Sequence, residues 1–411
     1  MVTPTTLERL RHALPGDTER PPQHYVLDGV TPAIAFAPGD GSEVATLLHR
    51  ADEAGVAVAP QGARTATALG RPLARYDIAL DLRGLERVIE YVPEDLVVTV
   101  QAGVTLAALQ STLREHGQYL PVDPPPGDEV TIGGMLASAR SGAWRGHLPA
   151  ARDLLLGMLV ALPSGEVVHS GGRVVKNVTG YDMHRMHAGA LGAFGVIVEA
   201  SFKLSPAPVA TRTLLLPAAS VQACGALSQR VWDASLAVRA ITVLGARAAD
   251  GAMLAPVPAV LVEAAGSAIS VERTLRELRA LAPGAGEAPA EVWARLRRLA
   301  AGPGATVLRI GVPPMEVDAT VEALEGAGLA AWAHLAAGSV ITRGEVSADE
   351  IEGLRALAVQ HGGFLQVEVA SAALRETVDP TAAEERSLVE ALKAQFDPRG
   401  TVNPGRWGAG L

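Results

Sequence analysis

Glycines in pairs and at short intervals between residues 130 and 206 are the residues of this 411-residue chain best suited to hold a ligand. TIGGMLA spans residues 131–137, GGRVVKNVTGYD spans residues 171–182, and GALGAFG spans residues 189–195. Glycine lets the main chain approach a ligand where a side chain would block it. Together with a turn at residues 163–165, this pattern predicts a backbone folded around a large flat cofactor.

The glycines of residues 189–195 also suggest the phosphate-binding turn of a Rossmann fold. That turn follows a strand and opens a helix. Here the glycines precede a strand-like run, VIVEASFKL. The order of elements therefore argues against a Rossmann turn.

In order and spacing, TIGGMLA, RDLLLGMLVALPSGEVV, KNVTGYD and GALGAFGVIVEASFKL resemble the FAD-binding domain of the vanillyl-alcohol oxidase (PCMH) type. The version they resemble is that of bacterial glycolate oxidase subunits, particularly the smaller FAD-binding E subunits. The resemblance covers residues from about 30 to 208 and the tail FDPRGTVNPGRW. It implies bound FAD. Binding should be non-covalent, because the loop at residues 60–65 lacks the histidine or cysteine to which some relatives attach FAD.

The resemblance assigns a set of residues to the cofactor site, with backbone atoms near Val196 and Ile197 facing the ring system. The set is Pro60, Gln61, Gly62, Ala63, Arg64, Thr65, Gly70, Pro124, Thr131, Ile132, Gly133, Gly134, Ala137, Ser138, Ser141, Gly142, Gly192, Gly195, Val196 and Ile197. No catalytic residue follows from the sequence.

The loop at residues 60–65 departs from the family pattern of consecutive glycines ending in threonine. Successive backbone N–H groups form an anion site only where no side chain blocks it. Ala63 and Arg64 stand where glycines are expected, at roughly 1 kcal/mol per residue if φ is positive. Arg64 either pairs with a phosphate or fills the space that FAD needs.

Two other motifs have structural alternatives. The TIGG segment also fits a tight helix start capped by Thr131, although this leaves the glycine pair and Gly142 unexplained. Lys176, Gly180, Tyr181 and Asp182 match a KNxxGYD signature typical of glycolate oxidase-like members. Lys176 either stabilises charge near the flavin or is a surface lysine.

Histidines and arginines elsewhere give weaker signals. His184 and His187 lie three apart, but no acidic or cysteine partner has metal-site spacing, so we expect solvated or capping histidines and no metal. The histidine-rich HxGDGNxH-like segment of catalytic relatives is absent from the sequence. We expect His334, in an apolar helix-like run, and His361, at a helix end, to be structural. For Arg309 and Arg343, we expect exposure to solvent rather than a role in binding the carboxylate of a substrate. The histidines and arginines considered are His184, His187, His334, His361, Arg309 and Arg343.

The predicted architecture is α+β, with a two-lobed FAD-binding domain at residues 1–208, a cap or partner-binding domain with an antiparallel sheet at 209–378, and a C-terminal segment at 379–411 packing on the FAD domain. In the first domain, strand, helix and strand are expected at residues 33–38, 41–55 and 56–60, with Ser42 able to cap the helix. Expected strands of the second domain are 211–217, 240–245, 259–266, 306–312, 338–346 and 364–370, and helices are 270–283, 290–300, 317–328 and 348–362. A last helix is expected at 382–396.

Composition excludes several classes of ligand and metal site. A net charge of −9 argues against nucleic acid, and the single cysteine, Cys224, excludes a disulfide or a cysteine-ligated iron–sulfur cluster within this chain. With no signal-like start and no apolar run of about 20 residues, we expect a cytoplasmic protein without a membrane span.

The resemblance implies a subunit that oxidises glycolate to glyoxylate. Its implied partners are a homologous larger flavin subunit and an iron–sulfur subunit that receives the electrons. Two alternatives stay open: a non-catalytic scaffold with weak or no FAD binding, and a stand-alone FAD-dependent dehydrogenase for a small hydroxy acid or alcohol.

Overall fold

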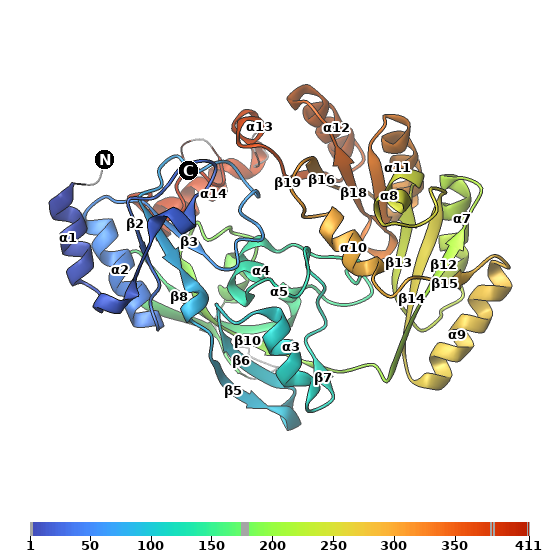
Figure 1. Cartoon of the computed structure of the whole chain (residues 1–411), viewed down its shortest axis with the longest axis horizontal. Coiled ribbons are helices and arrows are strands. Elements are labelled where there is room, and N and C mark those ends of the chain that lie inside the picture. The colour runs from blue at the N-terminus through green and yellow to red at the C-terminus, as the bar shows by residue number, and fades with distance from the viewer. Residues whose placement is uncertain (1–2, 174–180, 379, 381–382, 409, 411) are drawn as a thin grey trace.

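The computed structural model describes residues 3–173, 181–378, 380, 383–408 and 410. Two sheets near the N-terminus form one half of the molecule, and a large third sheet with its helices forms the other (Figure 1). The mixture of helices and largely antiparallel sheets confirms the predicted α+β class.

The first sheet has the strand order β1-β2-β4-β3, in which β2, β4 and β3 are parallel. Helix α2 buries Val44, Leu47 and Leu48 in one hydrophobic core with the strands of this sheet. Asp40 caps α2, because its Oδ1 accepts the N–H groups of Ser42 (2.8 Å) and Glu43 (3.0 Å), so the expectation of a Ser42 cap is wrong. The elements are α1 (Pro4–His12), β1 (Glu19–Arg20), β2 (Ile34–Phe36), α2 (Gly41–Glu53), β3 (Val58–Gln61) and β4 (Ile78–Asp81).

The second sheet is antiparallel, in the order β5-β6-β10-β8-β9. Its central strand β10 directly follows the glycines of residues 189–195, as the sequence predicted. A small pair, β7 with β11, flanks it. The elements are β5 (Val88–Val92), β6 (Val97–Gln101), α3 (Leu106–Arg114), β7 (Gln118–Tyr119), α4 (Ile132–Ser138), α5 (Ala151–Leu154), β8 (Leu155–Ala161), β9 (Val167–Gly171), α6 (His184–His187), β10 (Val196–Lys203) and β11 (Ser205–Pro206).

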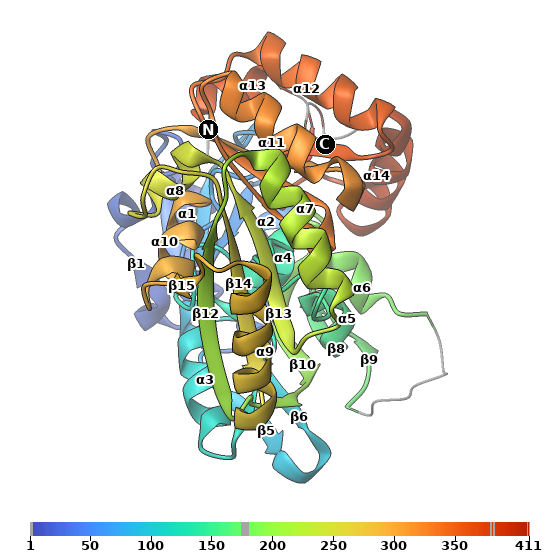
Figure 2. The same ribbon diagram turned by 90° about the vertical axis from the view of Figure 1, so that its right-hand side faces the viewer.

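The third sheet is antiparallel throughout, in the order β15-β12-β14-β13-β17-β18-β16-β19. Helices α7, α9, α11 and α12 share a core with one face, and Figure 2 shows α7 and α9 lying over the strands. The elements are β12 (Ala210–Pro217), α7 (Val221–Asp233), β13 (Val238–Leu244), α8 (Ala246–Gly251), β14 (Ala259–Gly266), α9 (Ala268–Leu281), β15 (Gly286–Glu287), α10 (Val292–Leu299), β16 (Thr306–Gly311), α11 (Val317–Gly326), β17 (Ala330–His334), β18 (Ser339–Gly344), α12 (Ala348–Gln360) and β19 (Phe364–Val369).

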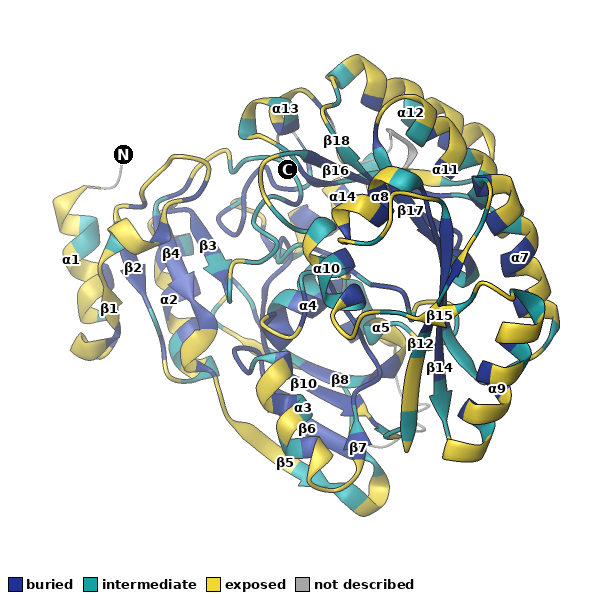
Figure 3. Ribbon diagram, turned by 45° about the vertical axis from the view of Figure 1, so that its right-hand side comes forward, coloured by how far each residue is buried: buried dark blue, intermediate teal, exposed yellow. Residues whose placement is uncertain are grey.

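The opposite face of this sheet carries α8 and α10 and is turned toward the first half of the molecule (Figure 3). His334 lies in β17, and its Nδ1 is 2.9 Å from the Thr242 Oγ1. The helix-like interpretation of this run is therefore wrong. Burial lowers the pKa of His334 to about 3, so the ring is neutral and structural, as expected.

After α13 (Ala372–Thr377) and α14 (Ala383–Phe396), the tail returns to the first sheet. Val402 forms a parallel bridge with Val58 in β3, which confirms the predicted return. The domain boundaries at residues 208 and 378 stay predictions. None of the helices in the described ranges has the length and apolar character to span a bilayer.

Candidate functional site

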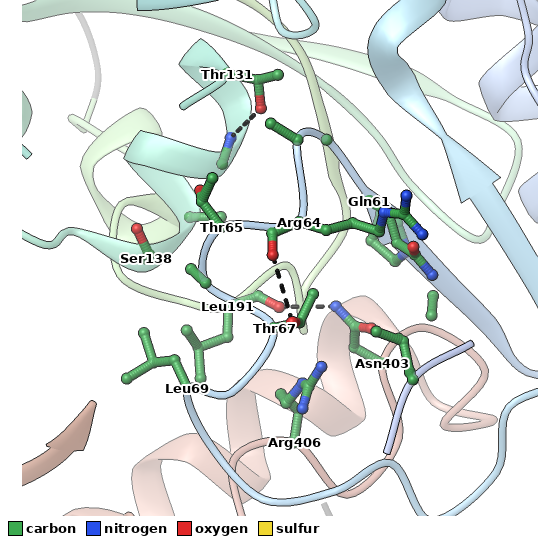
Figure 4. A pocket seen from close by; sticks show the side chains of 18 residues that line it. Gln61, Arg64, Thr65, Thr67, Leu69, Thr131, Ser138, Leu191, Asn403 and Arg406 are labelled. Atoms are coloured by element: carbon green, nitrogen blue, oxygen red, sulfur yellow. Dashed lines mark hydrogen bonds between the residues drawn. The ribbon is translucent and has the colours of Figure 1, made fainter. Parts of the chain in front are cut away.

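Most of the predicted cofactor residues meet where the loop after β3, the start of α4 and the loop before β10 come together. A cavity of about 100 Å³ lies there (Figure 4). The predicted residues that line it are Pro60, Gln61, Gly62, Ala63, Arg64, Thr65, Thr131, Gly134, Ala137 and Ser138. An adjoining hollow of about 70 Å³ shares some of these and adds Gly133, Gly192, Gly195, Val196 and Ile197.

The close fit of the β3 loop against α4 explains why residue 62 is a glycine. Thr131 caps α4, since its Oγ1 accepts the N–H of Gly134 at 3.3 Å. A Cβ added at Gly62 would lie 2.1 Å from that oxygen. The structural alternative for the TIGG segment, a helix start capped by Thr131, is therefore present, and it forms part of the cavity wall.

Arg64 departs from the family pattern in its backbone but not by filling the cavity. Its φ is +60°, a conformation that costs a non-glycine residue about 1 kcal/mol, whereas Ala63 does not have a positive φ. The Arg64 guanidinium donates to the carbonyl of His24 and lies 5.5 Å from the centre of the Tyr25 ring. The side chain is thus engaged outside the loop.

Five predicted residues lie outside both hollows: Gly70, Pro124, Ile132, Ser141 and Gly142. Ile132 is fully buried in the core of the second sheet, and Pro124 is buried next to Asp123 in the chain. Gly70 has a φ of +76°, and a Cβ there would lie 2.6 Å from the Arg406 carbonyl oxygen. Gly70 therefore makes room for the C-terminal tail.

Ser141 and Gly142 line a separate small cavity between the two halves, beside Asp123, Arg309 and His334. A Cβ at Gly142 would lie 2.4 Å from the Asp123 carbonyl oxygen, so the two segments are in direct contact. The Asp123 carboxylate accepts the N–H of Trp144 at 3.1 Å. Burial outweighs this hydrogen bond and raises the pKa of Asp123 to about 7.

The raised pKa of Asp123 makes stability depend on pH. Between its ordinary pKa near 4 and about 7, the folded state keeps a proton that the unfolded state has lost. Stability therefore falls as pH rises through this window and is constant above it. At pH 8, Asp123→Asn is expected to raise the free energy of unfolding, by up to about 4 kcal/mol at 1.36 kcal/mol per pKa unit.

Urea unfolding at pH 4 and pH 8 measures this difference. Asp128→Asn is the matched control, because Asp128 is exposed on the same loop and should change stability at neither pH. An equal effect of Asp123→Asn at both pH values would contradict the assignment.

The buried polar atoms of the hollow fit a cofactor that brings its own hydrogen-bonding groups. Gln61 donates from Nε2 to the Tyr76 hydroxyl at 2.6 Å, which leaves its buried Oε1 without a partner in the described part of the chain. Gly192 and Gly195 have φ of +68° and +144° and present bare main chain at these two positions. An unpaired acceptor beside bare main chain suits FAD, which the wall of residues 60–65 and 133–138 would hold.

The two predicted histidines lie in α6 and are buried, not solvated. His184 Nδ1 is 3.2 Å from the Ser170 Oγ, and His187 contacts the Phe396 ring edge-on. Burial lowers the pKa of His187 to about 4. Within the described residues, no group of three or more side chains of metal-ligand type gathers.

The KNxxGYD signature is only partly visible. Lys176 and Gly180 lie outside the described residues, so their predicted roles stay open. The Tyr181 side chain is 90% exposed, and Asp182 pairs with Arg185 at 3.3 Å.

Both candidate arginines of the third sheet are occupied by protein groups. Arg309 is buried and its Nε lies 2.5 Å from the Glu368 Oε1, so the expectation of solvent exposure is wrong. Arg343 is half-buried and donates to the carbonyls of Leu299 (3.1 Å) and Gly302 (2.8 Å), which closes the end of α10. His361 lies at the C-terminal end of α12, as predicted.

Some residues that line the hollows are not predicted from the sequence. They are Leu27, Ala59, Ala66, Thr67, Leu69, Leu82, Leu191, Asn403 and Arg406. Asn403 donates from Nδ2 to the Leu191 carbonyl at 2.8 Å, as Figure 4 shows. The sequence signal for Asn403 and Arg406 was the tail motif NPGRW, in which a turn-forming Pro-Gly pair separates these two polar residues.

Comparison with known proteins identifies the family of this chain. A family model described as an FAD binding domain matches residues 32–171. Over 356 residues the chain is 30% identical to the glycolate oxidase subunit GlcE of Escherichia coli (strain K12). The aligned residues cover 85% of this chain and 92% of that subunit. It is 26% identical over 417 residues to the glycolate oxidase subunit GlcD of Bacillus subtilis (strain 168), which spans 91% and 88% of the two chains.

Among solved structures, p-cresol methylhydroxylase with substrate bound matches 99% of this chain and 98% of its own, with a TM-score of 0.77 and 14% identity. A likeness at this identity shows the shared fold. The match to GlcE and to the FAD binding domain model shows that the chain belongs to the FAD-dependent oxidoreductase family of the vanillyl-alcohol oxidase (PCMH) type that includes the glycolate oxidase subunits, and that its cofactor is FAD.

Proposed function

We propose that this chain is the FAD-binding subunit of a glycolate oxidase-type complex that oxidises a small 2-hydroxy acid, glycolate to glyoxylate. The observation that carries the proposal is the similarity to GlcE along nearly the whole of that subunit. The glycine-lined hollow supports it, because it offers the bare main chain that a flavin dinucleotide needs.

FAD, when bound, supplies a two-electron acceptor for the hydride equivalent that leaves the α-carbon of the acid. The chain holds FAD non-covalently through the loop at residues 60–65 and the start of α4. Electrons then leave to partners, a homologous larger flavin subunit and an iron–sulfur subunit, because this chain has a single cysteine. No side chain is proposed as the catalytic base.

A second candidate is a non-catalytic FAD-binding scaffold. One observation favours it: the guanidinium of Arg309, which lines the cavity between the halves, is taken up by Glu368, Ser339 and Ser141. An arginine held in this way is not free to bind a substrate carboxylate.

An anaerobic absorption experiment separates these functions. The purified chain is expected to be yellow, and heat or acid denaturation is expected to release the flavin into the supernatant. Bleaching of the flavin band by glycolate in the chain alone would place the oxidation here, and bleaching only with both partners present would identify an electron-relay subunit. A flavin never reduced by glycolate with partners favours the scaffold, and a folded, colourless protein that binds no added FAD refutes the proposal.

A further inference from the structure

The C-terminal tail forms a third wall of the FAD hollow. The N–H of Val58 donates to the Thr401 carbonyl at 2.7 Å, and the N–H of Asn403 donates to the Val58 carbonyl at 2.9 Å. Buried Lys393 ties the tail to the neighbouring loop through the carbonyls of Val402 (2.6 Å) and Ala193 (2.8 Å). The tail is therefore held at the strand that leads into residues 60–65.

Arg406 places a buried cation at this wall. Its side chain is 7% exposed and lines the cavity together with the loop at residues 60–67 (Figure 4). One guanidinium nitrogen, Nη1, donates to the Arg71 carbonyl at 2.9 Å, and the Arg406 carbonyl accepts the N–H of Arg71 at 3.0 Å. These contacts fix the backbone and one end of the guanidinium while the group borders the hollow.

The positive charge of Arg406 has no paired carboxylate in the described ranges. Nearby Asp28 is already paired with Arg375. Burial and the neighbouring Arg375 lower the pKa of Arg406 to about 10, so the side chain still carries its charge at neutral pH. A buried charge without a counterion is costly, and an anion in the adjoining cavity would offset that cost.

We propose that Arg406 is the cation that pairs with the diphosphate of FAD, and that it supplies the charge that Arg64 does not. Both arginines line the cavity, but Arg64 is exposed and its guanidinium is held by the His24 carbonyl and the Tyr25 ring, whereas Arg406 is buried. Guanidinium groups form strong charge-assisted hydrogen bonds with phosphate oxygens. Asn403, also in the wall, keeps its side chain on the Leu191 carbonyl. The inference rests on the FAD assignment and not on the substrate.

The test is a titration of the apo-protein with FAD, in which flavin fluorescence measures binding. Arg406→Met keeps much of the side-chain volume and removes the charge, and we expect its Kd for FAD to be roughly 10- to 100-fold weaker than wild type. Arg406→Lys is expected to recover part of the loss. Arg75→Met is the matched control, because exposed Arg75 also anchors the tail, through the Gly400 carbonyl at 3.0 Å, but lies outside the cavity; its Kd should equal that of wild type.

Inorganic pyrophosphate tests the charge directly. It is expected to raise the melting temperature of the wild-type apo-protein and to compete with FAD, and to do neither in Arg406→Met. Riboflavin, which lacks phosphate, should bind both proteins equally.

An unchanged Kd for FAD in folded Arg406→Met would overturn the inference. If that variant does not fold, the Lys variant and pyrophosphate competition in the wild type decide, and a failure of pyrophosphate to compete also overturns it. Because no hydroxy acid is used, this outcome is independent of the proposed oxidation.

Discussion

Replacing Glu368 with alanine is expected to lower the free energy of unfolding by about 3–5 kcal/mol, because it leaves two buried guanidinium groups without their shared anion. Glu368 is fully buried between Arg140 and Arg309. Its Oε2 accepts from Arg140 Nη2 at 2.7 Å, and its Oε1 accepts from Arg309 Nε at 2.5 Å. Arg140 follows α4 while Glu368 and Arg309 belong to the third sheet, so the loss also weakens the contact between the two halves.

Urea unfolding at pH 7 measures the loss. Glu352→Ala is the matched control, since Glu352 forms an exposed pair with Arg355 and such pairs contribute about 0–1 kcal/mol. Burial raises the pKa of Glu368, but Arg309 and Arg140 outweigh it and lower the pKa to about 2. The contribution is therefore complete above the ordinary pKa near 4.5 and is lost as pH falls toward 2. A Glu368→Ala loss no larger than that of Glu352→Ala would show that the cluster does not join the halves.

Replacing Gly62 with alanine is expected to yield a protein without bound FAD that is less stable by about 1–3 kcal/mol. The new Cβ would lie 2.1 Å from the Thr131 Oγ1 and 3.1 Å from the Thr131 Cβ. Thr131 is 2% exposed and caps α4, so moving its side chain away would break the cap. A shift of the β3 loop instead would change the wall that we propose holds FAD. The flavin absorption of the purified protein and its melting temperature measure both effects.

A double-mutant cycle isolates this contact. Thr131→Ala alone is expected to cost about 1 kcal/mol through the lost cap. In the Gly62→Ala, Thr131→Ala double variant the closest clashing oxygen is gone, so FAD binding is expected to return in part and the two stability losses should not add. Strict additivity, with no return of flavin, would show that another contact requires glycine at residue 62.

Local signals were enough to predict most elements. The helix expected at residues 41–55 forms α2 (Gly41–Glu53), and the strand expected at 259–266 forms β14 with the same bounds. Several elements were missed, among them β17 and α7. The run at residues 330–334 is alanine-rich and helix-favouring, but it forms β17 because it pairs with β13 and β18. No helix was predicted over residues 221–233, although Ser220 caps α7.

The candidate site divides in the same way. Glycine spacing predicts the loops of the hollow, because a position that requires bare main chain can be recognised from the single glycine residue there. The environments of charged side chains depend instead on distant partners. Arg309 meets Glu368 59 residues away, and Arg140 meets it 228 residues away, so neither burial nor pairing is visible in the neighbouring sequence. Arg406 was missed for the same reason.

The bridge between Val58 and Val402 also bears on how the holoprotein is made. Arg75, just beyond the first cofactor loop, is hydrogen-bonded to Gly400, 325 residues further along the chain. During synthesis, the N-terminal lobe emerges and folds before its last wall exists. Loading with flavin is then expected to follow synthesis of residues 401–406, and chains that stop before these residues should remain in the apo form.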